Sequence, residues 1–211
     1  MTEKEIERIR DKIKKLRDQL AGEKRRFGGY FDNGGRRYML PELYIKIRDY
    51  KGGLNYYRWF SREFSDDVGL PSFHLFCTMI LFQNKKFREA IRSAYKTAFS
   101  NTYLIDLLCK NTVGNIDKFE FSGAENLSYA LQIADKCEEL LTKDFKVWLC
   151  SLHRSDEFTA NMKKFISIQK LIKDEEEDSL LSQLNDASEK LQKQLTEEEI
   201  DEAVSIYSNY N

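Results

Sequence analysis

Apolar residues recur at intervals of three and four along most of the chain, and polar or turn-forming residues separate the apolar segments. This spacing is typical of amphipathic helices. The first segment, residues 2–21, opens with Thr2 and Glu5 at the spacing of a capping box. Its narrow apolar seam consists of Ile6, Ile9, Ile13, Leu16 and Leu20. The seam predicts a helix that either docks on the rest of the chain or pairs with a second copy.

Residues 40–60 read LPELYIKIRDYKGGLNYYRWF, which predicts two short helices joined by a turn at residues 48–50. A charged residue, an aromatic residue and a short run of turn-forming or small residues recur along the chain. The aromatic residues of this pattern stand at positions 50, 87, 121 and 158, so the steps between them are 37, 34 and 37 residues. A period of this length is typical of stacked helical hairpins.

The same hydrophobic pattern predicts the remaining helices. Pro71 stands where a helix can begin, residues 111–118 have no helical pattern, and Ser122 and Glu125 have capping spacing. The expected helices cover residues 73–83, 87–99, 101–110, 122–141, 145–152 and 158–172. An acidic run at 174–178 precedes another helical pattern at Leu180–Leu191, and a capping box at Thr196 and Glu199 predicts a last helix.

The hairpin period and its residues resemble the tetratricopeptide repeat family, whose unit is a helix-turn-helix of about 34 residues. Gly53 falls on the family's first conserved alanine, Leu40 and Tyr44 on its leucine and tyrosine positions, and Tyr57 on a later aromatic position. Pro41 replaces the family's glycine, and no repeat has the terminal proline. The resemblance implies an all-α, right-handed solenoid of about four hairpins with helical ends. A helical bundle with the same spacing is the alternative.

We expect three parts of the chain: an N-terminal helix and linker over residues 1–35, a repeat domain over 36–173, and an acidic helical cap over 174–211. Their charges differ in sign. Residues 1–37 hold 12 Lys and Arg against 7 Asp and Glu, which gives +5. Residues 173–211 hold 3 against 12, which gives −9. Segregated charge of this kind indicates a partner or docking between parts of the chain.

Composition favours a reducing, cytoplasmic setting. The 211 residues include only two prolines and ten glycines, and no apolar run approaches the roughly 18 residues of a membrane span. The start, MTEKE, is charged and has no apolar signal core. The four cysteines, at positions 77, 109, 137 and 150, lie within apolar patterns and do not suggest a disulfide framework.

Few residues suggest chemistry. His74 with Cys77 and Cys150 with His153 are pairs with three-residue spacing, and Cys₂His₂ is a known zinc ligand set. Both cysteines also belong to apolar stripes, and a solenoid would separate the two pairs, so we expect no metal site. The sequence contains no P-loop, dinucleotide fingerprint, HExxH motif or recognisable catalytic triad. It therefore predicts a protein that is not an enzyme and needs no cofactor.

The resemblance implies an adaptor that binds a protein or peptide in the concave groove lined by the first helix of each hairpin. By the same resemblance the groove residues are Tyr38, Glu42, Lys46, Ser72, Met79 and Gln83. Segment 22–37 is expected to break the first helix. Residues 25–38 interleave arginines with aromatic residues and offer an alternative, an accessory factor that contacts nucleic acid. The arginines of this alternative are Arg25, Arg26, Arg36 and Arg37.

Overall fold

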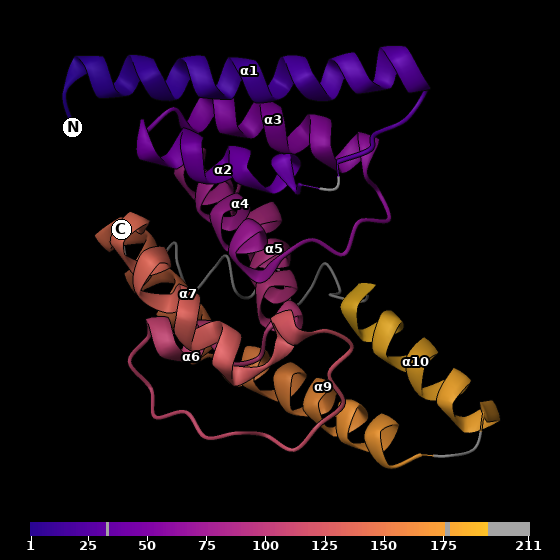
Figure 1. Cartoon of the computed structure of the whole chain (residues 1–211). Helices are drawn as coiled ribbons and strands as arrows, with labels where there is room; N and C mark the ends of the chain where they lie inside the picture. The colour runs from indigo at the N-terminus through magenta and orange to yellow at the C-terminus, as the bar shows by residue number, and fades with distance from the viewer. Residues whose placement is uncertain (33, 176–177, 194–211) are drawn as a thin grey trace.

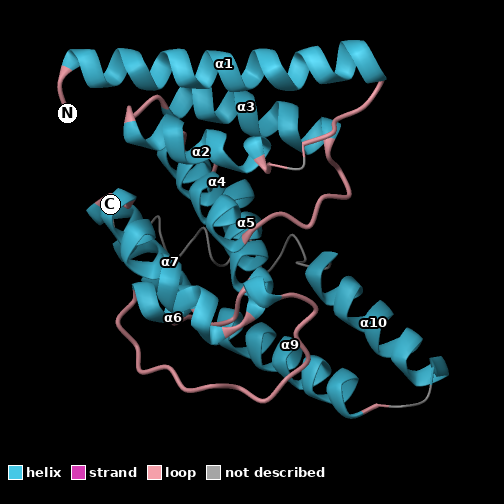
Figure 2. Ribbon diagram, viewed as in Figure 1, coloured by secondary structure: helices cyan, strands magenta, loops and turns pink. Residues whose placement is uncertain are grey.

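The computed structural model describes residues 1–32, 34–175 and 178–193, and within these ranges the chain is entirely helical, without a β-strand (Figures 1 and 2). The capping box at 196–199 lies outside these residues. The described helices are α1 (Glu3–Phe27), α2 (Arg36–Lys46), α3 (Tyr50–Glu63), α4 (Pro71–Gln83), α5 (Phe87–Ser100), α6 (Leu104–Leu108), the 3-10 helix η1 (Gly123–Glu125), α7 (Leu127–Leu140), α8 (Lys143–His153), α9 (Asp156–Asp174) and α10 (Asp178–Lys193).

Helix α1 lies across α2 and α3, and the α4–α5 hairpin extends from this layer toward α6–α9 (Figure 1). The predicted seam of α1 is docked on its own chain. Its residues Ile13, Leu16 and Leu20 are buried in one hydrophobic cluster together with Tyr56 of α3 and Phe73 of α4. A second cluster joins α4 and α5 to α6, α8 and α9. Helix α4 therefore contributes to both apolar cores.

The predicted break of the first helix at Gly22 is wrong, because α1 continues to Phe27. A glycine in a helix costs only about 1 kcal/mol relative to alanine, so local contacts can outweigh it. Two such contacts follow Gly22 directly: Glu23 is ion-paired with Arg36, and Lys24 with Glu63. The helix ends at Gly28, whose φ of 72° is the left-handed conformation that glycine adopts without strain.

The turns of the first two hairpins share one backbone geometry. Arg48 and Lys85 stand 37 positions apart and have φ values of 54° and 58°. The next residue in each turn donates its N–H to the carbonyl five positions earlier, Asp49 to Tyr44 at 3.0 Å and Lys86 to Leu81 at 2.9 Å. This pattern closes the C-terminus of the preceding helix. The same geometry recurs at Lys110, where φ is 59° and the Asn111 N–H donates to the Asp106 carbonyl at 2.9 Å. Because Lys110 follows Lys85 by 25 positions, only the first 37-residue step of the predicted period is matched by these turns.

The third predicted hairpin differs from the first two. Helix α6 spans only five residues, and an irregular connection follows it, as predicted for 111–118. Helix α7 starts later than expected, because Asn126, whose side chain accepts the Tyr129 N–H, is its N-cap in place of Ser122. The connection runs along α9, where the Phe119 N–H donates to the Gln169 carbonyl at 2.9 Å.

Pro41 lies inside α2, not in its first turn, because the helix begins earlier than its sequence pattern indicates. A proline has no N–H, so the carbonyl four residues before it, that of Arg37, lacks its helical donor. The hydroxyl of Tyr56, a fully buried residue of α3, donates to this carbonyl at 2.7 Å. The neighbouring helix therefore completes the hydrogen bonding that Pro41 interrupts.

Replacing Tyr56 with phenylalanine should lower the free energy of unfolding by about 1–2 kcal/mol, because it leaves a partly buried carbonyl unpaired. Chemical denaturation measures this cost. A Pro41→Ala background is the control: alanine restores the N–H that reaches the Arg37 carbonyl, so the cost of Tyr56→Phe should become smaller there. An equal cost in both backgrounds would contradict the assignment of this hydrogen bond.

Candidate functional site: the α2–α4 face and helix α7

The residues predicted to line a groove lie on α2 and α4, which are neighbouring helices, and several of them contact the helices that follow. Glu42 of α2 accepts from Lys46 at 2.7 Å and from Lys136 of α7 at 3.0 Å. Burial tends to raise the pKa of the Glu42 carboxyl, but its hydrogen bonds with the two lysines outweigh this effect and lower the pKa. Glu42 is therefore a charged anchor for a lysine from another helix.

The α4 residues of this set also have partners within the chain. The Ser72 side chain lies near Tyr129 of α7 and acts against the rise in the pKa of Tyr129 that burial causes. Gln83 donates to the Thr142 hydroxyl at 2.8 Å and to the Asp144 carboxylate at 3.2 Å, at the start of α8. Glu42, Ser72 and Gln83 thus face α7 and the α7–α8 junction, so this part of the predicted groove is covered by the chain itself.

Two of the predicted groove residues do not belong to this face. Met79 has an exposed fraction of 0% and packs in the core, so its expected contact with a partner is not possible in this structure. Its position was assigned from the repeat pattern, but α4 is buried over nearly all of its surface. The Tyr38 hydroxyl donates to Asp67 at 2.5 Å, and burial, followed by this hydrogen bond, raises the pKa of Tyr38 to about 12.

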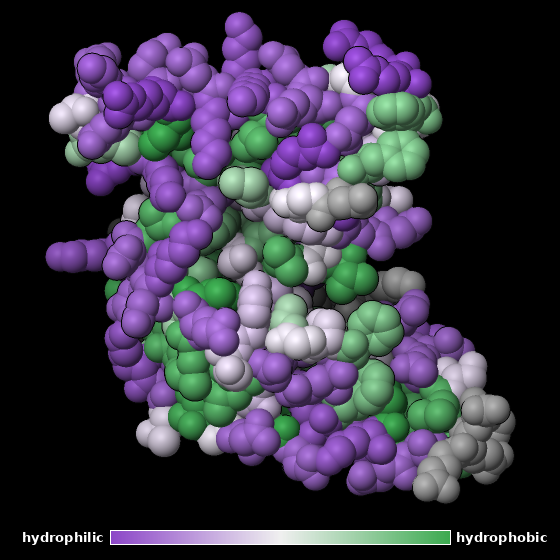
Figure 3. Space-filling view, viewed as in Figure 1, coloured by the Kyte–Doolittle hydropathy of each residue, from purple (hydrophilic) through white to green (hydrophobic). Residues whose placement is uncertain are grey.

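Helix α7 is held by a small apolar surface. Only Ala130 and Cys137 are buried, and Ile133 and Ala134 pack partly against the core. Leu131, by contrast, has an exposed fraction of 56%. Apolar side chains gather on the surface over α6 and α7, whereas hydrophilic side chains cover the molecule along α1 (Figure 3). Helix α7 is therefore one of the least buried helices among those the structure describes.

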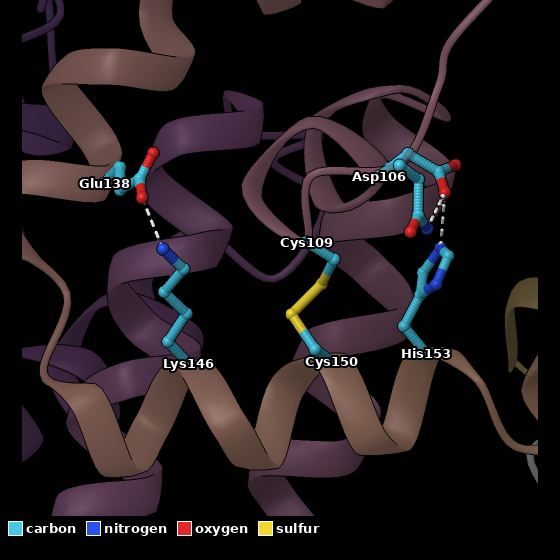
Figure 4. The surroundings of a disulfide bond; sticks show 7 residues. Asp106, Cys109, Glu138, Lys146, Cys150 and His153 are labelled. Carbon is cyan, nitrogen blue, oxygen red and sulfur yellow. Dashed lines mark hydrogen bonds and ion pairs between the residues drawn. A yellow bond between two sulfur atoms is a disulfide. The ribbon is translucent and has the colours of Figure 1, made fainter.

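One face of α8 connects to both α6 and α7 (Figure 4). Lys146 is ion-paired with Glu138 of α7, Cys150 forms a disulfide with Cys109, and the His153 Nε2 lies 3.5 Å from Asp106 Oδ1 of α6. The Cα atoms of the two cysteines are 5.6 Å apart, a usual separation for a disulfide. The sequence had indicated no disulfide, so this bond is a correction.

The disulfide also decides the question of the zinc ligand pairs. Cys150 is bonded to Cys109, while Cys77 is buried in the other hydrophobic cluster. The His74 Nε2 contacts the Val68 carbonyl at 2.6 Å, and burial lowers the pKa of His74 to about 4. The two pairs do not meet, and residues 1–32, 34–175 and 178–193 contain no cluster of side chains that could hold a metal ion.

The arginines of the nucleic-acid alternative divide into two groups. Arg25 and Arg26 are exposed near the end of α1. Arg36 and Arg37 both contact the buried carboxylate of Asp32, at 2.9 Å and 3.3 Å. Intramolecular ion pairs therefore already engage half of the predicted set.

The arrangement defines an all-α protein built of helical hairpins, in which α7 packs mainly on α6 and also contacts α2. A scan against models of protein families, a search of curated proteins and a search of solved structures each found no match to this chain. In the part of the chain that the structure describes, no helix combines the length and apolar character required to cross a membrane.

Proposed function

We propose that the protein is a non-enzymatic adaptor that binds a helical segment of a partner protein on the face formed by α2 and α4. The observation that supports this most directly is that a helix of the same chain, α7, lies against that face and pairs its Lys136 with Glu42. The face therefore has the geometry and charge to hold an amphipathic helix, which is a recurring mode of peptide recognition. The partner helix replaces α7 on this face.

The shallow docking of α7 supports such an exchange. Ala130 and Cys137 are its only buried residues within the described chain, and it follows a long connection that starts at Lys110. A covalently attached helix competes with a partner at an effective concentration near the millimolar range. The intact protein should therefore bind a partner helix weakly until α7 is displaced.

A synthetic peptide of residues 126–141 tests this proposal in trans. Fluorescence anisotropy would compare its binding to the wild type and to an Ala130→Glu variant, in which a carboxylate replaces a fully buried methyl group of α7. Because this change loosens α7, the peptide should bind the variant at least about tenfold more tightly than the wild type. Equal or absent binding to both proteins would refute the proposal.

A charge exchange locates the bound peptide. In the Ala130→Glu background, Glu42→Lys should weaken binding of the wild-type peptide. A peptide with Lys136→Glu should bind this Glu42→Lys protein well again, because the charges are then opposite. The matched control is a Glu139→Lys peptide, which reverses the charge of an exposed residue of the same helix. Its affinity should not depend on residue 42. If both altered peptides respond to Glu42→Lys in the same way, the peptide binds elsewhere.

A further inference from the structure

A cavity of about 600 Å³ lies between α1 and the α2–α3 hairpin, away from the face that holds α7. Its volume is within the range of small-molecule sites, about 300–1,000 Å³. Five cationic side chains line it, all of them from α1: Arg10, Lys14, Arg17, Lys24 and Arg25. One surface of a single helix therefore supplies the positive charge of the cavity.

Three carboxylates also line the cavity, which leaves a net charge of +5 − 3 = +2. Two of them have partners: Glu63 is ion-paired with Lys24 and accepts from the Tyr30 hydroxyl at 3.1 Å, and Asp49 accepts the Gly52 N–H at 2.8 Å. The third, Asp18, has no hydrogen bond or ion pair within the described residues. Charge complementarity still favours an anionic ligand.

The cations differ in how far they are engaged. Arg10 is paired with Glu7 at 3.2 Å, and Arg17 donates to the Tyr44 hydroxyl at 3.4 Å. Lys14 and Arg25 have no ion pair with any residue that the structure describes, so both can neutralise a ligand without giving up a bond. They stand eleven positions apart, about three turns of helix, which spreads the charge along the cavity.

The opposite wall is aromatic. Tyr30, Tyr44 and Trp59 line it, and Trp59 is held in place by ring contacts with Tyr56 at 5.3 Å and Phe64 at 5.6 Å between centroids. Trp59 itself is partly exposed. An indole that is fixed by its neighbours and lines a cationic cavity is suited to pack against a planar ring.

From this combination of free cations and a fixed indole, we propose that the cavity under α1 binds a nucleoside phosphate, with the phosphates near Lys14 and Arg25 and the planar base against Trp59. Neither wall is sufficient alone. Phosphate groups require the cations of α1, and the ring requires the aromatic residues of the hairpin and of the segment before it. The site does not depend on the α2–α4 face, so it adds a ligand to the adaptor function without requiring that function.

The full-length protein can be titrated with ATP in the absence of Mg²⁺, because Mg²⁺ would neutralise the phosphates. Saturable binding is expected by calorimetry, with a change in tryptophan emission. The chain has two tryptophans, and Trp148 is buried in the other cluster. Trp59→Phe should therefore remove the emission change, and Trp148→Phe should retain it. An emission change that persists without Trp59 would overturn the placement of the base.

Charge variants test the phosphate end. Lys14→Gln combined with Arg25→Gln should weaken ATP binding by about tenfold or more, because two charge-assisted contacts are lost. Lys4→Gln combined with Lys12→Gln is the matched control, since it removes two exposed charges of α1 that do not line the cavity. An equal loss in both double variants would indicate general electrostatic attraction and would overturn the site.

Two further probes separate the parts of the ligand. Adenosine and tripolyphosphate should each bind at least about tenfold more weakly than ATP, because each reaches only one wall. Tripolyphosphate that binds as tightly as ATP would overturn the role of the ring. A single-stranded oligonucleotide that binds much more tightly than ATP would replace this proposal with a nucleic-acid surface, and no saturable binding by any probe would reject the cavity as a ligand site.

Discussion

Replacement of Asp32 with alanine is expected to lower the free energy of unfolding by about 3 kcal/mol, because it removes a buried carboxylate that serves several donors at once. The side chain of Asp32 is fully buried. Its two oxygens accept the backbone N–H groups of Arg36 and Arg37, each at 2.8 Å, and the Arg36 Nε at 2.9 Å. Asp32 therefore caps the first turn of α2 and pairs with its two arginines.

The stabilising effect of Asp32 should depend on pH in a direction that follows from its pKa. Burial acts to raise the pKa of Asp32, but the hydrogen bonds from Arg37 and Arg36 outweigh it and hold the pKa below its ordinary value. A carboxyl with a lowered pKa stabilises the folded state fully above its unfolded pKa of about 4 and loses this effect as pH falls through its folded pKa. The stability difference between wild type and Asp32→Ala should therefore be largest at neutral pH.

Urea denaturation at pH 7 and near pH 3 would measure both quantities. Asp11→Ala is the matched control, because Asp11 is an exposed carboxylate of α1; its effect should stay within about 0.5 kcal/mol. A stability difference for Asp32→Ala that is equally large at both pH values would show that the cost comes from packing and not from the charged carboxylate.

The role of Asp32 also explains why the arginine segment was difficult to interpret from sequence. Arg36 and Arg37 stand in a run that reads as a basic, aromatic patch, and Asp32, the carboxylate that pairs with both of them, precedes them by four and five positions across two glycines. A local pattern cannot show that these glycines fold the chain back onto itself. The ion pairs of Arg36 with Glu23 and of Arg37 with Asp67 join residues farther apart in sequence. They could not be predicted from a local pattern for the same reason.

The first two hairpins could be predicted from sequence because their information is local. Apolar spacing and turn residues placed α3 within one residue of its observed end, and α4 and α5 within two residues at both ends. Only the first 37-residue step corresponds to a repeated turn, at Arg48 and Lys85. The short α6 could not be predicted in this way. Its pattern suits a longer helix, but Lys110, with φ 59°, ends the segment, and the chain then packs against α9.

The candidate site was only partly predictable. Glu42, Ser72 and Gln83 were singled out by resemblance, and they do lie on a face that holds another helix. Tyr129 and Lys136, which contact this face, were missed, because nothing in the pattern of α7 states where it docks. The only local signal was its weak apolar stripe around Ala130 and Cys137, which is typical of a helix with little burial.

Loss of the Cys109–Cys150 disulfide is expected to have the other large effect, about 4 kcal/mol of unfolding free energy in the chain-entropy account for a closed loop of this length. The two cysteines are separated by 41 residues. The closed loop contains the irregular connection and the whole of α7, so the bond restrains the helix that covers the α2–α4 face. A Cys109→Ala, Cys150→Ala double variant, compared with the wild type by urea denaturation, measures the cost.

The effect should be uneven across the molecule. Trp148 lies on α8 near Cys150, in the cluster that includes Cys109, whereas Trp59 packs against the separate cluster under α1. Reduction should therefore expose Trp148 at a lower denaturant concentration than Trp59. Fluorescence of a Trp59→Phe variant reports on Trp148 alone, and fluorescence of a Trp148→Phe variant reports on Trp59 alone. A Cys77→Ala, Cys137→Ala variant keeps both disulfide cysteines, so reductant should still lower its stability. Reductant should not change the stability of the Cys109→Ala, Cys150→Ala variant, which has no disulfide.

Reduction should also change binding, since a longer tether lowers the effective concentration of α7 at its face. In the proposed adaptor, the peptide of residues 126–141 should then bind the reduced protein more tightly than the oxidised protein, and Glu42→Lys should remove this gain. In a reducing compartment the bond would be open and the face more accessible. Peptide affinity that is identical in both redox states, with Trp148 unperturbed, would show that α6 and α8 hold α7 without help from the disulfide.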